Sequence, residues 1–540
     1  MFTDRGFLDD VRRIALPITA QAMIMSLLMM TDQLMVGQLG ATAVASVGIS
    51  AKITGIVSVV LAGLATGTTI FCAQYWGNKD TGRIRQIFGL SLALGLIFSS
   101  GMTALVAVFP TQVFGAFTTD AQVLADGGAY LRIVAISFVP TMATMIYSAV
   151  LRSTGQVKLP LYASTCAVIL NVVLDFGLIF GHLGLPELGL VGAAVGTTIA
   201  RFVEFVLIVG GTYATRHVAA VTRLGDLRGH DGGLPRRFLI VSLPLAANEL
   251  LWILGESAYA VVYGRMGTEQ MAAMSMTFPL QGLGIGLLSG LAGAASVLVG
   301  HRLGRGDYDG AADYAAKIIR LGVLLAVVVG AVVAAGSSFF VSLYQIAPEV
   351  QHLGRLCILV FCGFLWVKVA NMILAGAVLN AGGDSRFVLV MESLATWVVG
   401  VPTAFLAAFT IGLPIWWVYL LLSVEEVVRL AVGRRRLISR KWARSLVEPR
   451  RDGAGMPGTS GRAVRRSATA NLDRFPTISS PTHTERATMK FHSTNEPILR
   501  RAGNARPTMI IRREEPVDRW AVENLTRDAF WGMRGPGCDE

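Results

Sequence analysis

LPITAQAMIMSLLMMTDQLMVGQLG, residues 16–40, is an apolar stretch long enough to cross a bilayer as a helix, and it contains one carboxylate, Asp32. An ionised side chain in hydrocarbon is costly, so an Asp inside such a stretch predicts a functional site. A related stretch, LPLAANELLWILGESAYAVVYGRMG, follows at residues 243–267. The 540-residue chain is 53% hydrophobic and 15% charged, whereas soluble proteins have about 25% charged residues. These features predict an all-α integral membrane protein.

Apolar segments of spanning length occur in two sets of six. They fall at 14–38, 44–74, 88–110, 129–151, 160–181, 189–213, 238–263, 271–300, 317–342, 353–379, 387–410 and 414–433. The two sets align, since VGQLG (36–40) matches YGRMG (263–267) and AVLRSTGQ (149–156) matches AVLNAGGD (377–384). Six helices return the chain to the side where it began, so this duplication predicts a parallel repeat of two bundles.

The predicted domains follow from these segments. We expect a first six-helix bundle at 8–213, a cytoplasmic linker at 214–237 and a second six-helix bundle at 238–440. Basic residues gather in the loops of one side, which places that side and both termini in the cytoplasm. The same loops and a basic tail explain the net charge of +12, so we expect no nucleic-acid partner. The five cysteines show no spacing typical of a metal site.

The tail differs from the rest of the chain. Residues 441–508 are rich in Arg, Ser, Thr, Pro and Gly without apolar periodicity, which predicts disorder. Residues 509–540 resemble the truncated start of a GCN5-related N-acetyltransferase, cut off before the loop that would hold coenzyme A. A fragment of this size cannot bury a core, so we expect a fusion or reading-frame accident rather than a working enzyme.

Three helices of the first half place polar groups at one depth of the bilayer, counted at about 1.5 Å per residue. These groups are Asp32, Asn171 with Asp175, and Thr197. Burial and a second carboxylate both disfavour the charged form of a carboxyl group, so this cluster is a candidate site for a proton or a sodium ion. The alternative is that each Asp only hydrogen-bonds a neighbouring helix.

The second half has a different polar pattern. Tyr259 occupies the position that aligns with Asp32 in the duplication, and other charges appear at Glu249, Glu256 and Lys368. We expect Glu249 to lie near Lys368, either as a static pair or as a substrate contact, and Glu256 to contact a cation. Other ionisable residues lie nearer the cytoplasmic helix ends and are expected to snorkel or pair locally: Arg201, Glu204, Glu392, Glu425, Glu426 and Arg429.

Several motifs resemble those of the multidrug and toxic compound extrusion (MATE) transporters, in particular the DNA-damage-inducible branch. They are TDQLMVGQLG (31–40), NVVLD (171–175) and GAAVGT (192–197), within a duplication covering about residues 8–440. The resemblance implies a V-shaped pair of bundles that exports organic cations or amphipathic compounds in exchange for protons or sodium by alternating access. It places the ion-coupling residues at Asp32, Asn171, Asp175 and Thr197. The Asp on the tenth helix of the sodium-coupled branch is absent.

We therefore expect a monomeric antiporter in the cell (inner) membrane, without a cofactor other than its coupling ion. Candidate substrate contacts are Glu249, Glu256, Met29, Tyr259 and Lys368. A flippase for lipid-linked precursors is an alternative with similar architecture, and it would need a basic cavity. An intramembrane lipid-modifying enzyme is a second alternative, but the predicted spans hold no histidine near either Asp.

Overall fold

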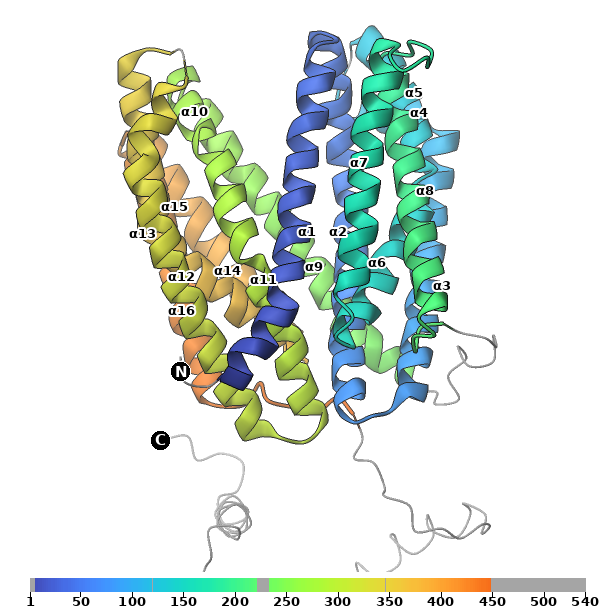
Figure 1. Cartoon of the computed structure of the whole chain (residues 1–540). Coiled ribbons are helices and arrows are strands. Elements are labelled where there is room, and N and C mark those ends of the chain that lie inside the picture. Colours follow the sequence, from blue (N-terminus) through green and yellow to red (C-terminus); the bar gives the residue numbers. More distant parts are fainter. Residues whose placement is uncertain (1–4, 119, 221–232, 345, 448–540) are drawn as a thin grey trace, which may run out of the picture. The chain divides into compact units, whose positions relative to one another are not determined.

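The computed structural model describes residues 5–118, 120–220, 233–344 and 346–447, whose regular structure is entirely helical (Figure 1). The helices of the first half are α1 (Arg5–Gly37), α2 (Ala41–Gly77), α3 (Thr81–Val108), α4 (Pro110–Gly115), α5 (Ala121–Ala135), α6 (Phe138–Ser153), α7 (Lys158–Phe180) and α8 (Leu190–Ala214). Those of the second half are α9 (Leu234–Arg265), α10 (Thr268–Ser275), α11 (Thr277–Gly304), α12 (Tyr308–Ser342), α13 (Pro348–Ile373), η2 (Leu374–Leu379), α14 (Ser385–Leu394), η3 (Ala395–Gly400), α15 (Val401–Phe405), η4 (Leu406–Thr410) and α16 (Ile415–Ile438).

The described residues contain up to eleven spans that are apolar enough to cross a membrane, and one further helix that corresponds to the last predicted span. Ten are long and apolar enough on their own, and the bent pair α5–α6 supplies an eleventh. The twelfth, α16, has 24 residues but is less apolar because it carries Glu425, Glu426 and Arg429. The predicted fold class is confirmed.

The fourth predicted span, 129–151, is not one straight helix. It consists of α5 and α6, which meet at an angle of 45°. Pro140 explains the break, because it cannot donate a backbone hydrogen bond to the carbonyl of Ile136 and its ring clashes with that carbonyl. The chain accordingly leaves regular helix at Ile136 and Ser137.

The two bundles contact each other at one end, which we call the closed end; it contains the start of α1 and the ends of α2 and α11. A Cβ on Gly63 would overlap the backbone of Ala246, and one on Gly290 would overlap the carbonyl of Ala15. Small residues thus permit close helix approach here. At the opposite, open end, α1 has exposed apolar side chains, among them Leu34. The bundles therefore converge at the closed end, as the V-shaped arrangement requires.

Each bundle receives the beginning of the other bundle's first helix (Figure 1). The start of α1, from Phe7 to Ala15, packs in the hydrophobic core formed by α11 and α12, while the start of α9, from Leu234 to Leu245, packs in the core of the first half. Pro17 and Pro244 lie inside these helices close to the crossings. The bundle boundaries at 8–213 and 238–440 stay a prediction, to which the packing adds this exchange.

The segment after α16 bridges the two bundles. Trp442 is fully buried in the core of the second half, and Val447 packs in the core of the first. Gln74 donates to the carbonyl of Ala381 (2.7 Å) and accepts from the amide of Leu446 (2.7 Å). We call residues 441–447 the strap. Disorder was predicted from residue 441, but the strap is packed; the remaining tail and the acetyltransferase-like fragment lie outside the described residues.

Candidate functional site

The two acids of the first half come together. Asp32 on α1 and Asp175 on α7 approach within hydrogen-bonding range of each other, and Asn171 neighbours Asp175 one turn away on α7. Asp175 is only 1% exposed, Asn171 is also buried, and Asp32 is half-buried. Neither carboxyl group is therefore directed freely toward lipid. We call these residues, with Thr197, the acid site.

Helix α8 closes the acid site from the side. Gly196 lies so close to Asp175 that a Cβ there would overlap Oδ1 of the carboxyl group. Thr197 follows Gly196, and its side chain lies near the hydroxyl of Tyr130 on α5, which is also close to both acids. Tyr130 was not predicted. Its place just before the bend between α5 and α6 brings the hydroxyl inward, which the sequence alone did not indicate.

Several buried polar atoms of the acid site have no hydrogen-bond partner among the described residues. They are Oδ1 of Asp32, Oδ1 of Asp175 and Nδ2 of Asn171. Unsatisfied buried polar atoms are rare in folded proteins and require an explanation, such as an ion or a proton bound in another state. Within the described residues no group of three or more His, Cys, Asp or Glu side chains could hold a metal ion. The chemistry of this site fits a proton or a monovalent cation.

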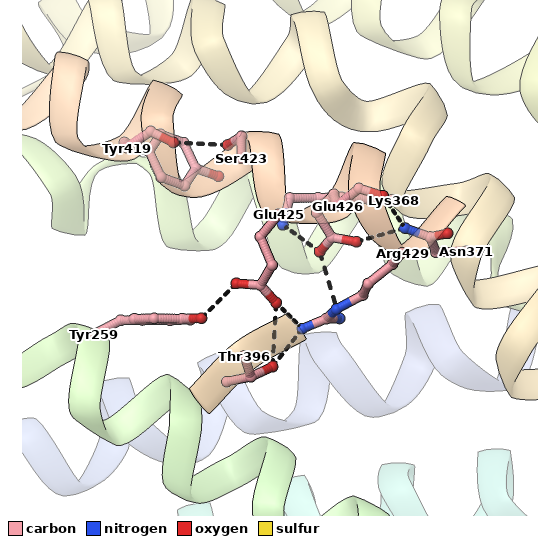
Figure 2. A network of polar contacts seen from close by, with 9 residues as sticks. All are labelled: Tyr259, Lys368, Asn371, Thr396, Tyr419, Ser423, Glu425, Glu426 and Arg429. Atoms are coloured by element: carbon pink, nitrogen blue, oxygen red, sulfur yellow. Dashed lines mark hydrogen bonds and ion pairs between the residues drawn. The ribbon is translucent and has the colours of Figure 1, made fainter. Parts of the chain in front are cut away.

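The second half contains a larger network, in which Arg429 is the central cation (Figure 2). Arg429 forms an ion pair with Glu425 one turn earlier on α16 and donates to the hydroxyl of Thr396 (2.6 Å). Thr396 donates in turn to Glu425 (3.1 Å), and Tyr259 donates to the other oxygen of Glu425 (2.6 Å). Tyr259, a predicted substrate contact, is thus buried and already engaged with a carboxylate.

Lys368 has a different partner from the one expected. It pairs with Glu426 (3.2 Å), which also accepts a hydrogen bond from Asn371 (2.8 Å). Glu249 interacts electrostatically with the carboxyl group of Glu392, and no contact between Glu249 and Lys368 is found among the described residues. Depth along the membrane placed both residues at one level, but the rotation of α9 directs Glu249 toward α14 instead of α13. The expectation of local pairing near the helix ends is confirmed for Glu425 and Arg429.

A small cavity of about 60 Å³ adjoins this network. That volume is enough for a few water molecules. Its lining includes Glu256, Trp252, Phe278 and Gln281 as well as the paired charges of α16 and Lys368. Glu256 has no ion pair within the described residues, so it is the acid of this cavity that is available to a cation. Met29, on α1, is 73% exposed one turn before Asp32 and does not line this cavity.

Comparisons with known proteins agree with the duplication. A family model described as MatE matches residues 17–177 and 244–406, one match in each half. A probable multidrug resistance protein NorM of Bradyrhizobium diazoefficiens is 26% identical over 446 residues, covering 80% of this chain and 94% of that protein. The uncharacterized transporter YisQ of Bacillus subtilis is 23% identical over 412 residues, covering 76% and 90%.

Solved structures show the same fold. An outward-facing multidrug resistance MATE family transporter of the MOP superfamily superposes with a TM-score of 0.74 at 20% identity, covering 80% of this chain and 96% of that one. A MOP superfamily transporter from Pyrococcus furiosus, described as having a binding pocket of reverse polarity, gives a TM-score of 0.71 at 20% identity with the same coverage.

Proposed function

Since the chain belongs to the MatE family of multidrug efflux transporters, we propose that it exports organic cations or other amphipathic compounds in exchange for protons by alternating access. Family membership makes the protein a transporter and not an enzyme. Sodium is the alternative coupling ion. The proposed location is the cell (inner) membrane, with the closed end and both termini in the cytoplasm and the monomer as the working unit.

The contact between Asp32 and Asp175 is the observation that carries this proposal. Two carboxylates that are both ionised repel each other, and carboxylate oxygens can only accept hydrogen bonds. Such a contact therefore requires a proton or a cation between the two groups. A protonated pair favours the arrangement in which α1 and α7 approach, and its ionisation favours their separation.

Exchange follows from this alternation. On the side where the acid site is protonated, the first bundle has no negative charge to offer a cationic compound. When the site opens toward the cytoplasm, the proton leaves and the carboxylates become available to cargo. One pH unit supplies about 1.4 kcal/mol per proton, or tenfold accumulation, if one proton exchanges for one cargo molecule.

Ion replacement in proteoliposomes tests the proposal. Purified full-length protein is reconstituted, and the uptake of ethidium is measured with a proton gradient alone, with a sodium gradient alone and with neither. We expect accumulation with the proton gradient, its collapse on addition of a protonophore, and its loss in Asp32→Asn. Exchange of labelled for unlabelled ethidium across the same vesicles reports whether that variant is folded.

Three results would contradict the proposal. Accumulation driven only by sodium would reject the proton and support the alternative ion. Wild-type accumulation by Asp32→Asn would reject the acid site, and transport that needs neither gradient would reject antiport altogether.

A further inference from the structure

A second polar layer lies in the first bundle, between the acid site and the closed end. Gln21 on α1 donates to the hydroxyl of Ser164 on α7 (2.6 Å), and Ser164 donates to Oε1 of Glu204 on α8 (2.7 Å). Arg201 pairs with Oε2 of Glu204 (2.8 Å), and Arg152 on α6 donates to Gln21 (3.2 Å). Four helices thus join one continuous hydrogen-bonded chain, which we call the lower layer.

The lower layer lies on the same helix faces as the acid site. Ser164 precedes Asn171 by seven residues on α7, and Glu204 follows Thr197 by seven residues on α8. A spacing of seven residues returns to one face of a helix and corresponds to about 10 Å along its axis. The lower layer therefore stands directly beneath the acid site, about two helical turns nearer to the closed end.

Arg201 connects the two layers. It lies between Thr197 and Glu204 on α8, is bound to Glu204, and acts electrostatically on Asp32. Among the described residues, Arg152 also interacts electrostatically with Glu204, while α7 presents Ser164 to it. Helix α5, which packs beside α8, presents the carbonyl of Ile133 and the ring of Tyr130 at the level above. A change in the charge of the acid site thus reaches Glu204 through a single side chain.

The lower layer also adjoins the contact that shuts the closed end. Thr19, two residues before Gln21, donates to the carbonyl of Leu287 on α11 (3.2 Å). Gly293 of α11 lies against Ile18 in the same region. Separation of the bundles at this end therefore uncovers the lower layer before it uncovers the acid site. Glu204 is 2% exposed in the present arrangement, so it is covered by protein and does not snorkel to the surface.

We propose that Glu204 relays the coupling proton from the acid site to the closed end, with Arg201, Ser164 and Gln21 holding its carboxylate in place. This inference rests on the proposed proton exchange. The O–H bond of the acid pair breaks as a water molecule between the layers takes the proton. A new O–H bond then forms on an oxygen of Glu204, and it breaks again when that proton passes to water at the opened closed end. Arg201 keeps its proton throughout, and no electron is transferred.

The second half supplies an internal comparison. In the duplication Asn248 aligns with Gln21 and Glu392 aligns with Ser164, and Asn248 donates to Glu392 (2.6 Å) as Gln21 does to Ser164. The repeat positions of Asp32 and Asp175, however, are Tyr259 and Thr403. The second half therefore has a half-buried carboxylate, Glu392, at the equivalent level, while Tyr259 and Thr403 take the places of the acid pair above it.

Glu204→Gln tests the relay, because glutamine can still accept from Ser164 but cannot carry the proton. Proteoliposomes are assayed for ethidium accumulation driven by a proton gradient and for ethidium exchange at equal pH, which needs no net proton movement. We expect accumulation to fall at least about tenfold with exchange retained, and Glu204→Asp to recover most of the loss. Matched controls are Glu392→Gln, in the second half, and Glu187→Gln, in an exposed loop; both should change accumulation less than about twofold.

The outcomes separate this inference from the proposed function. If the wild type accumulates ethidium with a proton gradient and Asp32→Asn does not, the proposed function stands, and wild-type accumulation by Glu204→Gln then overturns the relay alone. Equal losses in Glu204→Gln and Glu392→Gln also overturn it, since they indicate a general effect of removing a carboxylate from between the helices. Should Glu204→Gln lose exchange as well, Ser164→Ala decides: slower proton-driven uptake with normal exchange supports the relay, and unchanged uptake rejects it.

Discussion

Replacing Gly196 by alanine should uncouple transport without unfolding the protein. An alanine Cβ at this position would lie less than 3.0 Å from Oδ1 of Asp175, and Cβ atoms in proteins essentially never come so close to another heavy atom. The backbone of α8 is fixed by its packing on α7, so the carboxyl group has to move. The carboxyl group is the end of the short Asp175 side chain, so a rotation of this side chain can displace it. A displacement of roughly 1 Å moves the carboxyl group away from Asp32 and breaks the contact that holds the proton.

The size of the effect follows from what moves. Overpacking a buried site lowers the free energy of unfolding by about 1–3 kcal/mol. The lower value applies here because the added methyl group displaces the end of a side chain and not a helix. A displacement of about 1 Å at a reacting group can reduce a rate about 100-fold. We therefore expect a loss of proton-driven ethidium accumulation of about 10- to 100-fold with only a small fall in thermal stability.

Two other glycines of α8 provide matched controls. A Cβ at Gly192 meets the backbone of Leu178, whereas a Cβ at Gly210 meets open space. Gly192→Ala should lower the melting temperature more than Gly196→Ala and leave the coupling ratio of the folded fraction unchanged; Gly210→Ala should change neither. The assay combines thermal unfolding in detergent with proton-driven uptake in proteoliposomes. Equal coupling ratios in Gly196→Ala and Gly210→Ala would show that the position of Asp175 does not govern the exchange.

Three further predictions concern other parts of the molecule. Tyr130→Phe removes a hydroxyl that lies near Thr197 and both acids. If this hydroxyl supports the acid site by about as much as one hydrogen bond, proton-driven uptake should fall about 2- to 10-fold, and an unchanged rate would remove Tyr130 from the acid site. Gln74→Ala leaves the carbonyl of Ala381 and the amide of Leu446 without their partner, and it should loosen the closed end by about 1–3 kcal/mol. In a variant whose only cysteine is the buried Cys72, the rate of maleimide labelling should therefore rise, and an unchanged rate contradicts the prediction. Burial lowers the pKa of His217 below its usual 6.5, so the neutral imidazole stabilises the fold above that pH, and this stability is lost as the pH falls. His217→Gln should therefore make the melting temperature depend less on pH between pH 7 and 5. A variant whose melting temperature falls as steeply as that of the wild type would refute this.

The fold could be predicted from the sequence because the bilayer imposes a simple rule. Every span must satisfy its own backbone hydrogen bonds, so each appears as an apolar run of fixed minimum length. The duplication then fixed the pairing of the two sets of spans. What the rule could not give was the bend at Pro140 and the packing of the strap, because both depend on which surfaces are left uncovered in three dimensions.

The contact between Asp32 and Asp175 could be anticipated because each acid interrupts an otherwise apolar run, and helical rise gives the depth of each. Depth does not give rotation about the helix axis. This is why the pairing of Lys368 was missed: acids on α9, α14 and α16 lie within reach of its level, and only the orientation of α16 selects Glu426. Tyr130 was missed for the same reason.

The charge pairs on the two sixth helices explain why a repeat in sequence does not imply a repeat in chemistry. When α8 and α16 are aligned at their first residues, Arg201 and Glu204 correspond to Glu426 and Arg429, with the two charges exchanged. Each half thus keeps a pair three residues apart, which is favourable in any helix, but the exchange reverses which charge faces which neighbour. In the first half the cation, Arg201, lies beneath an acid pair. In the second half the cation, Arg429, is bound by Glu425 and Thr396, and Glu426 is bound by Lys368. The second half therefore neutralises its charges internally, and proton exchange is left to the half in which two acids face each other.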